Sequence, residues 1–390
     1  MWKLGESRDR FYSENNLVHE NFWRWLFSKN GTLGDFTEKR HRDFFAWAPN
    51  RANCPEFEAA LDRLTDLAPL PWKATMRNIF VARVAKGDPN ATAWSFKSSG
   101  VVEVNYGFTR AAMIYATIFC QFYDAIATIW LDVDLATEDE EILQMIIDEI
   151  DQSALEPILV ADSSRASWLG GEGVFAAHPA LLELPSRTAV DSYHEAVCTV
   201  EEFVLAHEIS HHMLGHTEVS FRKSNDVARV VNGWISRVDT QGFYSTLNES
   251  QQQEVQADVA AFLLTCGELG GSCDRILLYR SISGAMLALT SLAHITEMWS
   301  SSNSEDSHPD YITRYTIIAG LIVELSKGMP RGEIGDHPRG FLLQFQGFIS
   351  MVLQAWLYRK GEEVQEPKFL NFFAWLMDES ARLDNEIVDA

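Results

Sequence analysis

The chain has 390 residues, of which 46% are apolar and 12% aromatic, so it can form one large globular core or two modest ones. This composition excludes disordered and fibrous proteins. The 32 basic and 55 acidic residues give a net charge of -23, which repels phosphate backbones and anionic lipid surfaces. We therefore expect neither nucleic acid nor an anionic membrane as a partner.

The cysteines and the first residues predict a cytoplasmic protein. The five cysteines are scattered, and none belongs to a C-x-x-C pair, which is typical of buried thiols in a reducing compartment. The opening sequence, MWKLGESRDRF, lacks the apolar segment of a secretory signal. We expect the protein to act in the cytoplasm.

The chain begins with a helical pattern over residues 1–75, and this region is rich in aromatic residues. We interpret its aromatic cluster at 22–27 as core packing, with a partner-docking surface as the alternative. From Asn78 the pattern changes to short β-type runs over 79–84, 93–96 and 101–105, separated by turn sequences. These runs predict a small antiparallel or mixed sheet, and after Gly107 the pattern is helical almost to the end.

Two apolar runs in the sequence could be membrane-spanning segments by their hydrophobicity. The run from Ala111 to Leu131 has nearly the required length, but Gln121 and Asp124 lie in its middle and would be costly in lipid. We interpret it as a buried core helix. The run over residues 282–292 is too short to span a membrane, so we predict no membrane span.

Three regions follow from these patterns. Residues 1–75 form an N-terminal helical region, residues 76–327 a central domain, and residues 328–390 a C-terminal helical region. Within the central domain, residues 132–151 predict an exposed acidic helix, and residues 152–190, with several glycines and prolines, predict an irregular insertion. The predicted fold class is α+β and predominantly helical.

The segment 191–216, DSYHEAVCTVEEFVLAHEISHHMLGH, carries the most specific motif. Ser192 and Glu195 have the spacing of a capping box, which predicts that a helix begins here. Apolar residues at steps of three and four form one face, which ends in His207 and His211. These histidines lie one helical turn apart, so both imidazoles can reach one cation. Because unpartnered imidazoles on an apolar face are costly, we favour metal ligands over core histidines.

The residue after the first histidine is Glu208, which completes the motif H-E-x-x-H. It projects beside the predicted cation and suits a general base that acts on water. A second pair, His212 and His216, is rotated from the first by well over about 100° on the predicted helix, so we do not expect it to join that metal. We therefore interpret this second pair as surface imidazoles, with a second metal site as the alternative.

A catalytic zinc site needs a third protein ligand and an open position. Ser250 and Gln253 predict the start of another helix, on which Glu254, Asp258 and two alanines share a face. The small alanines allow close approach to the first helix, so Glu254 is the best third ligand. Asp258, one turn further, would accept a hydrogen bond from a ligating histidine. The alternative is that both acids are solvated.

A third segment, residues 307–315, also predicts a helix start. Ser307 or His308 is expected to cap this helix, with Pro309 in its first turn. From spacing alone, His308 is an ordinary histidine of a capping region.

Together the three motifs resemble a known family. H-E-x-x-H with a later histidine, E-x-x-A-D, and H-P followed by arginine occur in the same order in the Lit-type phage-exclusion metallopeptidases of bacteria. A looser version belongs to the HtpX and CAAX-prenyl-protease group. The resemblance covers residues 78–325 in outline, on these residues: His207, Glu208, His211, His216, Glu254, Ala257, Asp258, His308, Pro309 and Arg314.

This resemblance implies a zincin-type, gluzincin-like fold in which His207, His211 and Glu254 bind Zn²⁺ and Glu208 is the base. It also implies that His308 and Arg314 lie near the site and stabilise the oxyanion. In the Lit family the cleaved protein is translation elongation factor Tu, so a translation factor and a role in abortive-infection antiphage defence are expected.

The sequence thus predicts a zinc-dependent endopeptidase that cleaves a cytoplasmic protein. A zinc-stabilised regulatory or protein-binding module without catalysis is the alternative, and it predicts a fourth protein ligand. The N- and C-terminal helical regions are where we expect a regulatory protein partner to bind.

Overall fold

The computed structural model describes residues 6–17, 54–84, 89–97, 99–132, 187–217, 225–240, 242–296 and 308–327, with residue 329 and most of 338–352. These residues form a mostly helical structure with one three-stranded sheet, so the α+β prediction is confirmed. The predicted aromatic cluster at 22–27, the acidic helix after residue 132 and most of the 152–190 insertion lie outside the described residues. The last residues of that insertion, 187–190, are helical.

The sheet consists of β1 (Ile79–Val84), β2 (Ala91–Phe96) and β3 (Ser99–Asn105). Its order is β1-β3-β2, with β1 parallel to β3 and β2 antiparallel to β3. The sheet is therefore mixed, and β2 lies at its edge. Lys97, which follows β2 directly, has a φ of 53°.

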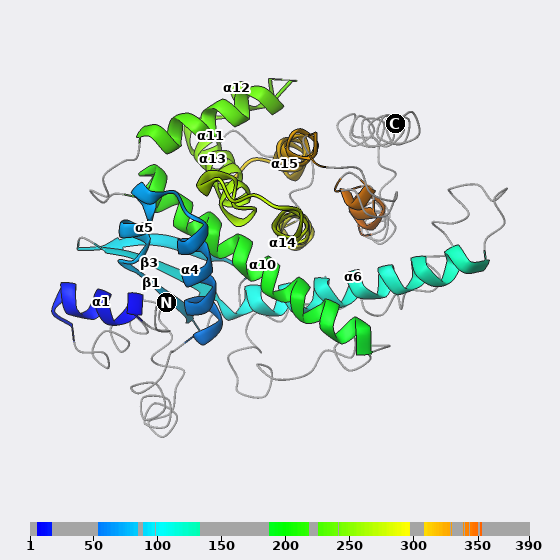
Figure 1. Ribbon diagram of the computed structural model, residues 1–390, viewed down its shortest axis with the longest axis horizontal. Helices are drawn as coiled ribbons and strands as arrows, with labels where there is room; N and C mark the ends of the chain where they lie inside the picture. Colours follow the sequence, from blue (N-terminus) through cyan, green and yellow to red (C-terminus); the bar gives the residue numbers. More distant parts are fainter. Residues whose placement is uncertain are drawn as a thin grey trace.

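The two faces of the sheet pack against different layers because alternate side chains point in opposite directions. Phe80 faces α1 (Glu6–Asn15), where its ring centroid lies 5.0 Å from that of Phe11. Val81 and Val102 face the main core, which α4 (Pro55–Leu67) and α5 (Leu70–Met76) help to cover. Figure 1 shows α1 and α4 next to the sheet, and the two apolar clusters place them on its opposite faces.

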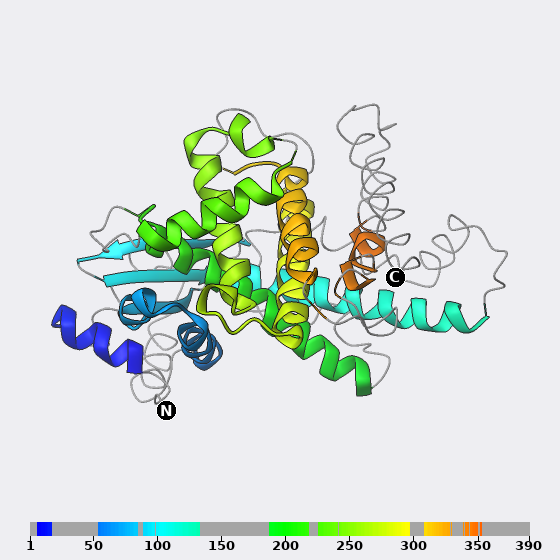
Figure 2. The same ribbon diagram turned by 45° about the horizontal axis from the view of Figure 1, so that its top comes forward.

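At the centre of the molecule lies α10 (Arg187–Leu214), which packs against α6 (Tyr106–Asp132), α13 (Glu249–Thr265) and α14 (Arg275–Thr296). Further helices among the described residues include α11 (Asn225–Val238), α12 (Phe243–Thr246), the 3₁₀-helix η3 (Glu268–Gly270) and α15 (Tyr311–Ser326). Figure 2 shows α14 and α15 running side by side next to α13. The sheet and the helix pair α10 and α13 together frame the site described below.

Two helices begin before their predicted starts. Helix α10 begins five residues before Ser192, so that residue lies within the helix instead of capping it. Helix α13 is capped by Asn248, not by Ser250, because Asn248 Oδ1 accepts the Gln251 N–H at 2.9 Å and the Gln251 side chain accepts the Asn248 N–H at 3.2 Å. A capping box is thus present, two residues earlier than predicted.

The two apolar runs that the sequence offers as candidate membrane spans belong to α6 and α14. Side chains of α6 up to Tyr123 are mostly buried, as expected for a core helix. Of the described helices, only α14 is long and apolar enough to cross a membrane by length and composition, over Arg275–Ala293, and 67% of that segment is buried inside the fold. The apolar run over residues 282–292 is therefore the middle of a longer helix, which extends beyond the run at both ends.

The cysteines only partly match the prediction of buried thiols. All five are free, and Cys54, Cys120 and Cys266 are buried. Cys273 is half-buried and Cys198 is exposed, because Cys198 lies on the outward side of α10. The prediction is therefore wrong for Cys198.

Candidate metal centre

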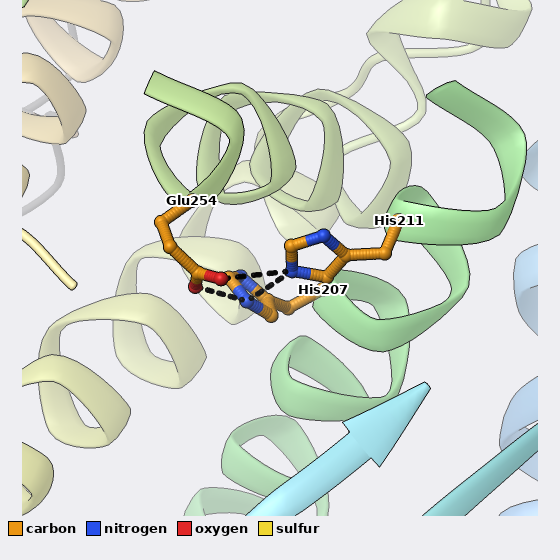
Figure 3. A group of neighbouring side chains, drawn as sticks. All are labelled: His207, His211 and Glu254. Carbon is orange, nitrogen blue, oxygen red and sulfur yellow. Dashed lines mark hydrogen bonds and ion pairs between the residues drawn. The ribbon is translucent and has the colours of Figure 1, made fainter. Parts of the chain in front are cut away.

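His207 and His211 on α10 and Glu254 on α13 point toward one another (Figure 3). The two Nε2 atoms lie 3.1 Å apart, and the Glu254 oxygens lie 3.2 Å from His207 Nε2 and 3.5 Å from His211 Nε2. Ligand atoms around tetrahedral zinc are separated by about 3.4 Å, given metal–ligand distances of about 2.1 Å. These three residues could therefore hold a divalent cation.

Close packing of α10 against α13 brings the three side chains together. Ala257 and Ala261, on the same face of α13 as Glu254, are fully buried. Helices approach closely where small residues line their contact. The structure thus brings Glu254 next to His207 and His211, on a helix whose small residues allow the close approach.

Asp258 contacts the Nδ1 atom of His207, and Arg314 in turn contacts Asp258. Asp258 Oδ1 lies 2.9 Å from His207 Nδ1, and Arg314 donates to both Asp258 oxygens at 2.7 Å. Burial acts to raise the pKa of Asp258, but the Arg314 guanidinium holds it below its usual range. The ionised Asp258 accepts the Nδ1–H of His207, which turns Nε2 toward His211 and Glu254.

The protonation of the two histidines differs because their neighbours differ. Burial alone would lower the pKa of His207, but hydrogen bonds to Asp258 and Glu254 raise it to about 10. Burial and the nearby His207 lower the pKa of His211 to about 3, so its ring is neutral. A proton and a cation would therefore compete at His207.

The side chain of Glu208 extends from α10 toward the edge strand β2. Its side chain is buried, and the backbone N–H of Ala93 hydrogen-bonds its carboxylate. Burial raises the pKa of Glu208 to about 7, with an opposing effect of His207 and a further rise from Glu254. A carboxyl group with this pKa can both accept and release a proton near neutral pH.

The orientation of β2 explains how Ala93 reaches Glu208. Asn90 O accepts the N–H of Asn105 at 2.9 Å, and hydrogen-bonded pairs alternate along an antiparallel ladder. The N–H and C=O groups of Ala91, Ala93 and Ser95 therefore point away from β3. The site thus has a strand edge beside it.

A cavity of about 850 Å³ opens onto these residues. Helix α14 lines it with apolar side chains, among them Leu289, Leu292 and Ile295. Residues Ala91 to Ala93 of β2 line it as well. The predicted site residues that face the cavity are His207, Glu208, His211, Glu254, His308 and Arg314.

His308 lies beside Glu254 but outside a helix. Its Nε2 is 3.3 Å from Glu254 Oε2, and 49% of its side chain is exposed. Asp310, whose Oδ1 accepts the Thr313 N–H at 2.8 Å, caps α15. The predictions that Ser307 or His308 caps this helix and that Pro309 lies in its first turn are therefore wrong.

The prediction of surface imidazoles at His212 and His216 is also wrong. His212 is fully buried, where Nε2 donates to Val101 O at 3.2 Å and Nδ1 lies 3.0 Å from Thr217 Oγ1. His216 Nδ1 lies 3.1 Å from His211 Nδ1. Among the described residues, neither belongs to a group of three or more potential ligands.

The error at His216 has a simple physical cause. Helical spacing was applied to a residue that lies beyond the last helical residue, Leu214. Gly215 has a φ of +74°, which reverses the chain and returns His216 to the side of His211. The glycine after an apolar helical stripe was the signal for this turn.

Comparison with known proteins adds one family. No curated protein and no solved structure matches the chain. Residues 176–324 match the family Peptidase U49, and this range contains the candidate metal ligands His207, His211 and Glu254, together with Glu208, Asp258, His308 and Arg314. The match supports a peptidase, with the candidate centre inside the matched segment.

Proposed function

We propose that the protein is a zinc-dependent endopeptidase with a zincin-type, gluzincin-like catalytic region. The observation that carries this proposal is the convergence of His207, His211 and Glu254 beside Glu208 in a cavity of about 850 Å³. All four residues lie within the segment that matches Peptidase U49.

The residues fit zinc better than other common metals. Two imidazoles and one carboxylate form a ligand set typical of zinc hydrolases, whereas Ca²⁺ and Mg²⁺ prefer oxygen ligands. Zinc bound here would polarise the scissile carbonyl and lower the pKa of a water molecule. Three protein ligands that face a cavity leave a position open on the substrate side.

Glu208 supplies the proton transfers of peptide hydrolysis. Its carboxylate takes a proton from the attacking water as the new C–O bond forms, and passes it to the amine nitrogen as the C–N bond breaks. The Ala93 N–H holds the carboxylate in place. Because the pKa of Glu208 is about 7, both transfers are feasible near neutral pH.

The edge of β2 supplies backbone carbonyl groups that can accept from an extended peptide. Ala91 and Ala93 turn their C=O groups away from β3 at the wall of the cavity, whereas the Ala91 N–H donates to Asn90 Oδ1 and the Ala93 N–H contacts Glu208. A substrate strand paired there would pass Glu208 and the metal-binding group. This arrangement supports cleavage within a chain.

For the cellular role, we propose cleavage of a cytoplasmic protein, in particular a translation factor, in abortive-infection antiphage defence. The order of the three motifs, which resembles the Lit-type metallopeptidases, and the Peptidase U49 match support this proposal. We further propose that regulatory protein partners bind the N- or C-terminal helical regions.

A zinc-stabilised module without catalysis is the competing function. It requires a closed site with four protein ligands. Among the described residues, the group contains three, and the cavity lies beside them. This observation favours the enzyme.

The decisive experiment compares Glu208→Gln with wild type in the native host, with and without phage infection. Glu195→Gln, an exposed site on the same helix, is the matched control. New protein N-termini are identified by mass spectrometry, and zinc is measured in each purified protein. We expect zinc in all three proteins and new N-termini only with wild type and the control. Undiminished cleavage by Glu208→Gln would reject Glu208 as the base.

A further inference from the structure

We propose that His216 is a positioning residue that fixes the ring orientation and the tautomer of His211. It would do so as the first member of a chain of hydrogen bonds that leads away from the metal centre. This inference rests on the metal centre proposed above, and it adds a residue that helical spacing had excluded from it.

The backbone places His216 through a defined helix end. Gly215 N–H donates to His212 O at 3.2 Å, and His216 N–H donates to His211 O at 2.9 Å. With a left-handed glycine between the helix and His216, these two bonds form a Schellman motif. That motif brings the residue after the glycine close to the residue five positions earlier, which here is His211.

The side chains of His211, His216 and Gln256 form a continuous series of hydrogen bonds. His211 Nδ1 lies 3.1 Å from His216 Nδ1, and His216 Nε2 lies 3.0 Å from Gln256 Oε1. Gln256 Nε2 donates to Asn232 Oδ1 at 3.0 Å and to Tyr244 Oη at 2.7 Å. The amide thus uses both of its N–H groups on α11 and α12, and its oxygen is left to accept from His216.

Only one donor-to-acceptor order along this series of hydrogen bonds is compatible with a metal bound at His211. A ligating His211 presents the Nε2 lone pair, so its single proton is on Nδ1. That N–H donates to Nδ1 of His216, whose own proton is then on Nε2 and donates to Gln256. The orientation of Gln256 and the requirement of the metal therefore agree on the same tautomers.

The two ligand histidines therefore have different hydrogen-bond partners at their Nδ1 atoms. His207 Nδ1 contacts the Asp258 carboxylate, which is paired with Arg314, whereas His211 Nδ1 contacts the imidazole of His216. Loss of an outer partner of a ligating histidine weakens metal binding by about 10- to 100-fold. Loss of the His216 acceptor should have an effect in that range without removing any ligand.

The test compares His216→Leu with His216→Asn in the purified full-length protein. Leucine removes the acceptor, whereas the amide oxygen of asparagine can take the place of Nδ1. His194→Leu, at an exposed position of α10, controls for the loss of a histidine elsewhere. Zn²⁺ affinity is measured by competition with a chelator, and the coordination geometry is read from the visible spectrum of Co²⁺-loaded protein.

We expect His216→Leu to weaken Zn²⁺ binding by about 10-fold or more and to alter the Co²⁺ spectrum. His216→Asn and His194→Leu should stay within about threefold of wild type, by the same reasoning. Wild-type affinity and spectrum in His216→Leu would overturn the role of His216 alone. Wild-type protein without stoichiometric metal would overturn the metal centre and this inference together. If His216→Leu does not fold, weakened binding in His216→Asn overturns the inference.

Discussion

Asp258 Oδ1 lies 2.9 Å from Nδ1 of His207, and this contact joins the two helices that carry the candidate metal ligands. Arg314 brings α15 into the same contact through two bonds of 2.7 Å to the carboxylate. Three helices that are distant in sequence therefore meet at one buried ion pair. Both the metal affinity and the packing of these helices should depend on it.

Replacement of Asp258 by alanine should reduce both properties. Zinc affinity should fall by about 10- to 100-fold, because His207 loses the acceptor that orients it. The free energy of unfolding should fall by about 3–5 kcal/mol, because the buried Arg314 loses its partner. Chelator competition and urea denaturation measure the two effects separately.

The double variant Asp258→Ala with Arg314→Met separates the two effects. It removes the uncompensated charge, so stability should recover in part, whereas zinc affinity should stay low. Recovery of zinc affinity in the double variant would show that Asp258 acts on the metal only through folding.

Metal binding should release a proton from His207 at pH values where an ordinary histidine has none to release. Hydrogen bonds to Asp258 and Glu254 raise the pKa of His207 to about 10 in the metal-free protein, against the opposing effect of burial. Zinc affinity should therefore keep rising with pH above about 6.5, the ordinary value for histidine. Calorimetry at pH 8 in buffers of different ionisation enthalpy measures the proton released, and its absence would contradict this account.

The same shift predicts how the stability of the metal-free protein depends on pH. The folded state binds a proton at His207 that the unfolded state has lost above about pH 6.5. The contribution is fully present below that pH and is lost as the pH rises toward about 10. Urea denaturation of chelator-treated protein at pH 6 and pH 9 should show lower stability at pH 9, and His207→Gln should reduce this difference.

Much of the site was predictable because its residues obey one periodicity. His207, Glu208 and His211 lie well inside α10, where a spacing of 3.6 residues per turn holds. Glu254 and Asp258 share a face with small residues on α13, so their approach to α10 also followed from local sequence. Errors of two to five residues in the helix starts did not disturb these relationships.

The remainder depended on contacts that no local pattern contains. The hydrogen bond from Ala93 to Glu208 requires that β2 lies at the sheet edge beside α10, and strand order is a property of the whole fold. His216 required the turn at Gly215 to be recognised as the end of the helix. The Arg314 bonds to Asp258 depend on how α15 packs against α13.

The crossing of α10 and α14 sets the apolar wall of the cavity, and Gly284 permits it. A Cβ at Gly284 would lie 2.4 Å from Thr199 O, so Gly284→Ala must displace one helix. We expect a loss of about 1–3 kcal/mol in the free energy of unfolding, as in other overpacked cores. Gly233→Ala on α11 is the matched control, because nothing lies within 4 Å of its added Cβ.

The control should gain up to about 1 kcal/mol, since alanine favours a helix more than glycine does. Urea denaturation of both variants measures the difference between them. Equal stability of Gly284→Ala and wild type would show that the two helices can separate freely at this crossing.

His308 distinguishes the enzyme from the zinc-stabilised module. Its Nε2 lies 3.3 Å from Glu254, but it is not in the group of three ligands, and half of its side chain is exposed at the cavity. If it stabilises the developing oxyanion, His308→Ala should keep stoichiometric zinc and lower kcat by about 100-fold. Metal analysis and cleavage of the identified substrate measure the two properties on the same sample. Loss of zinc from His308→Ala would instead make His308 a fourth ligand, which is the closed coordination that the non-catalytic module requires.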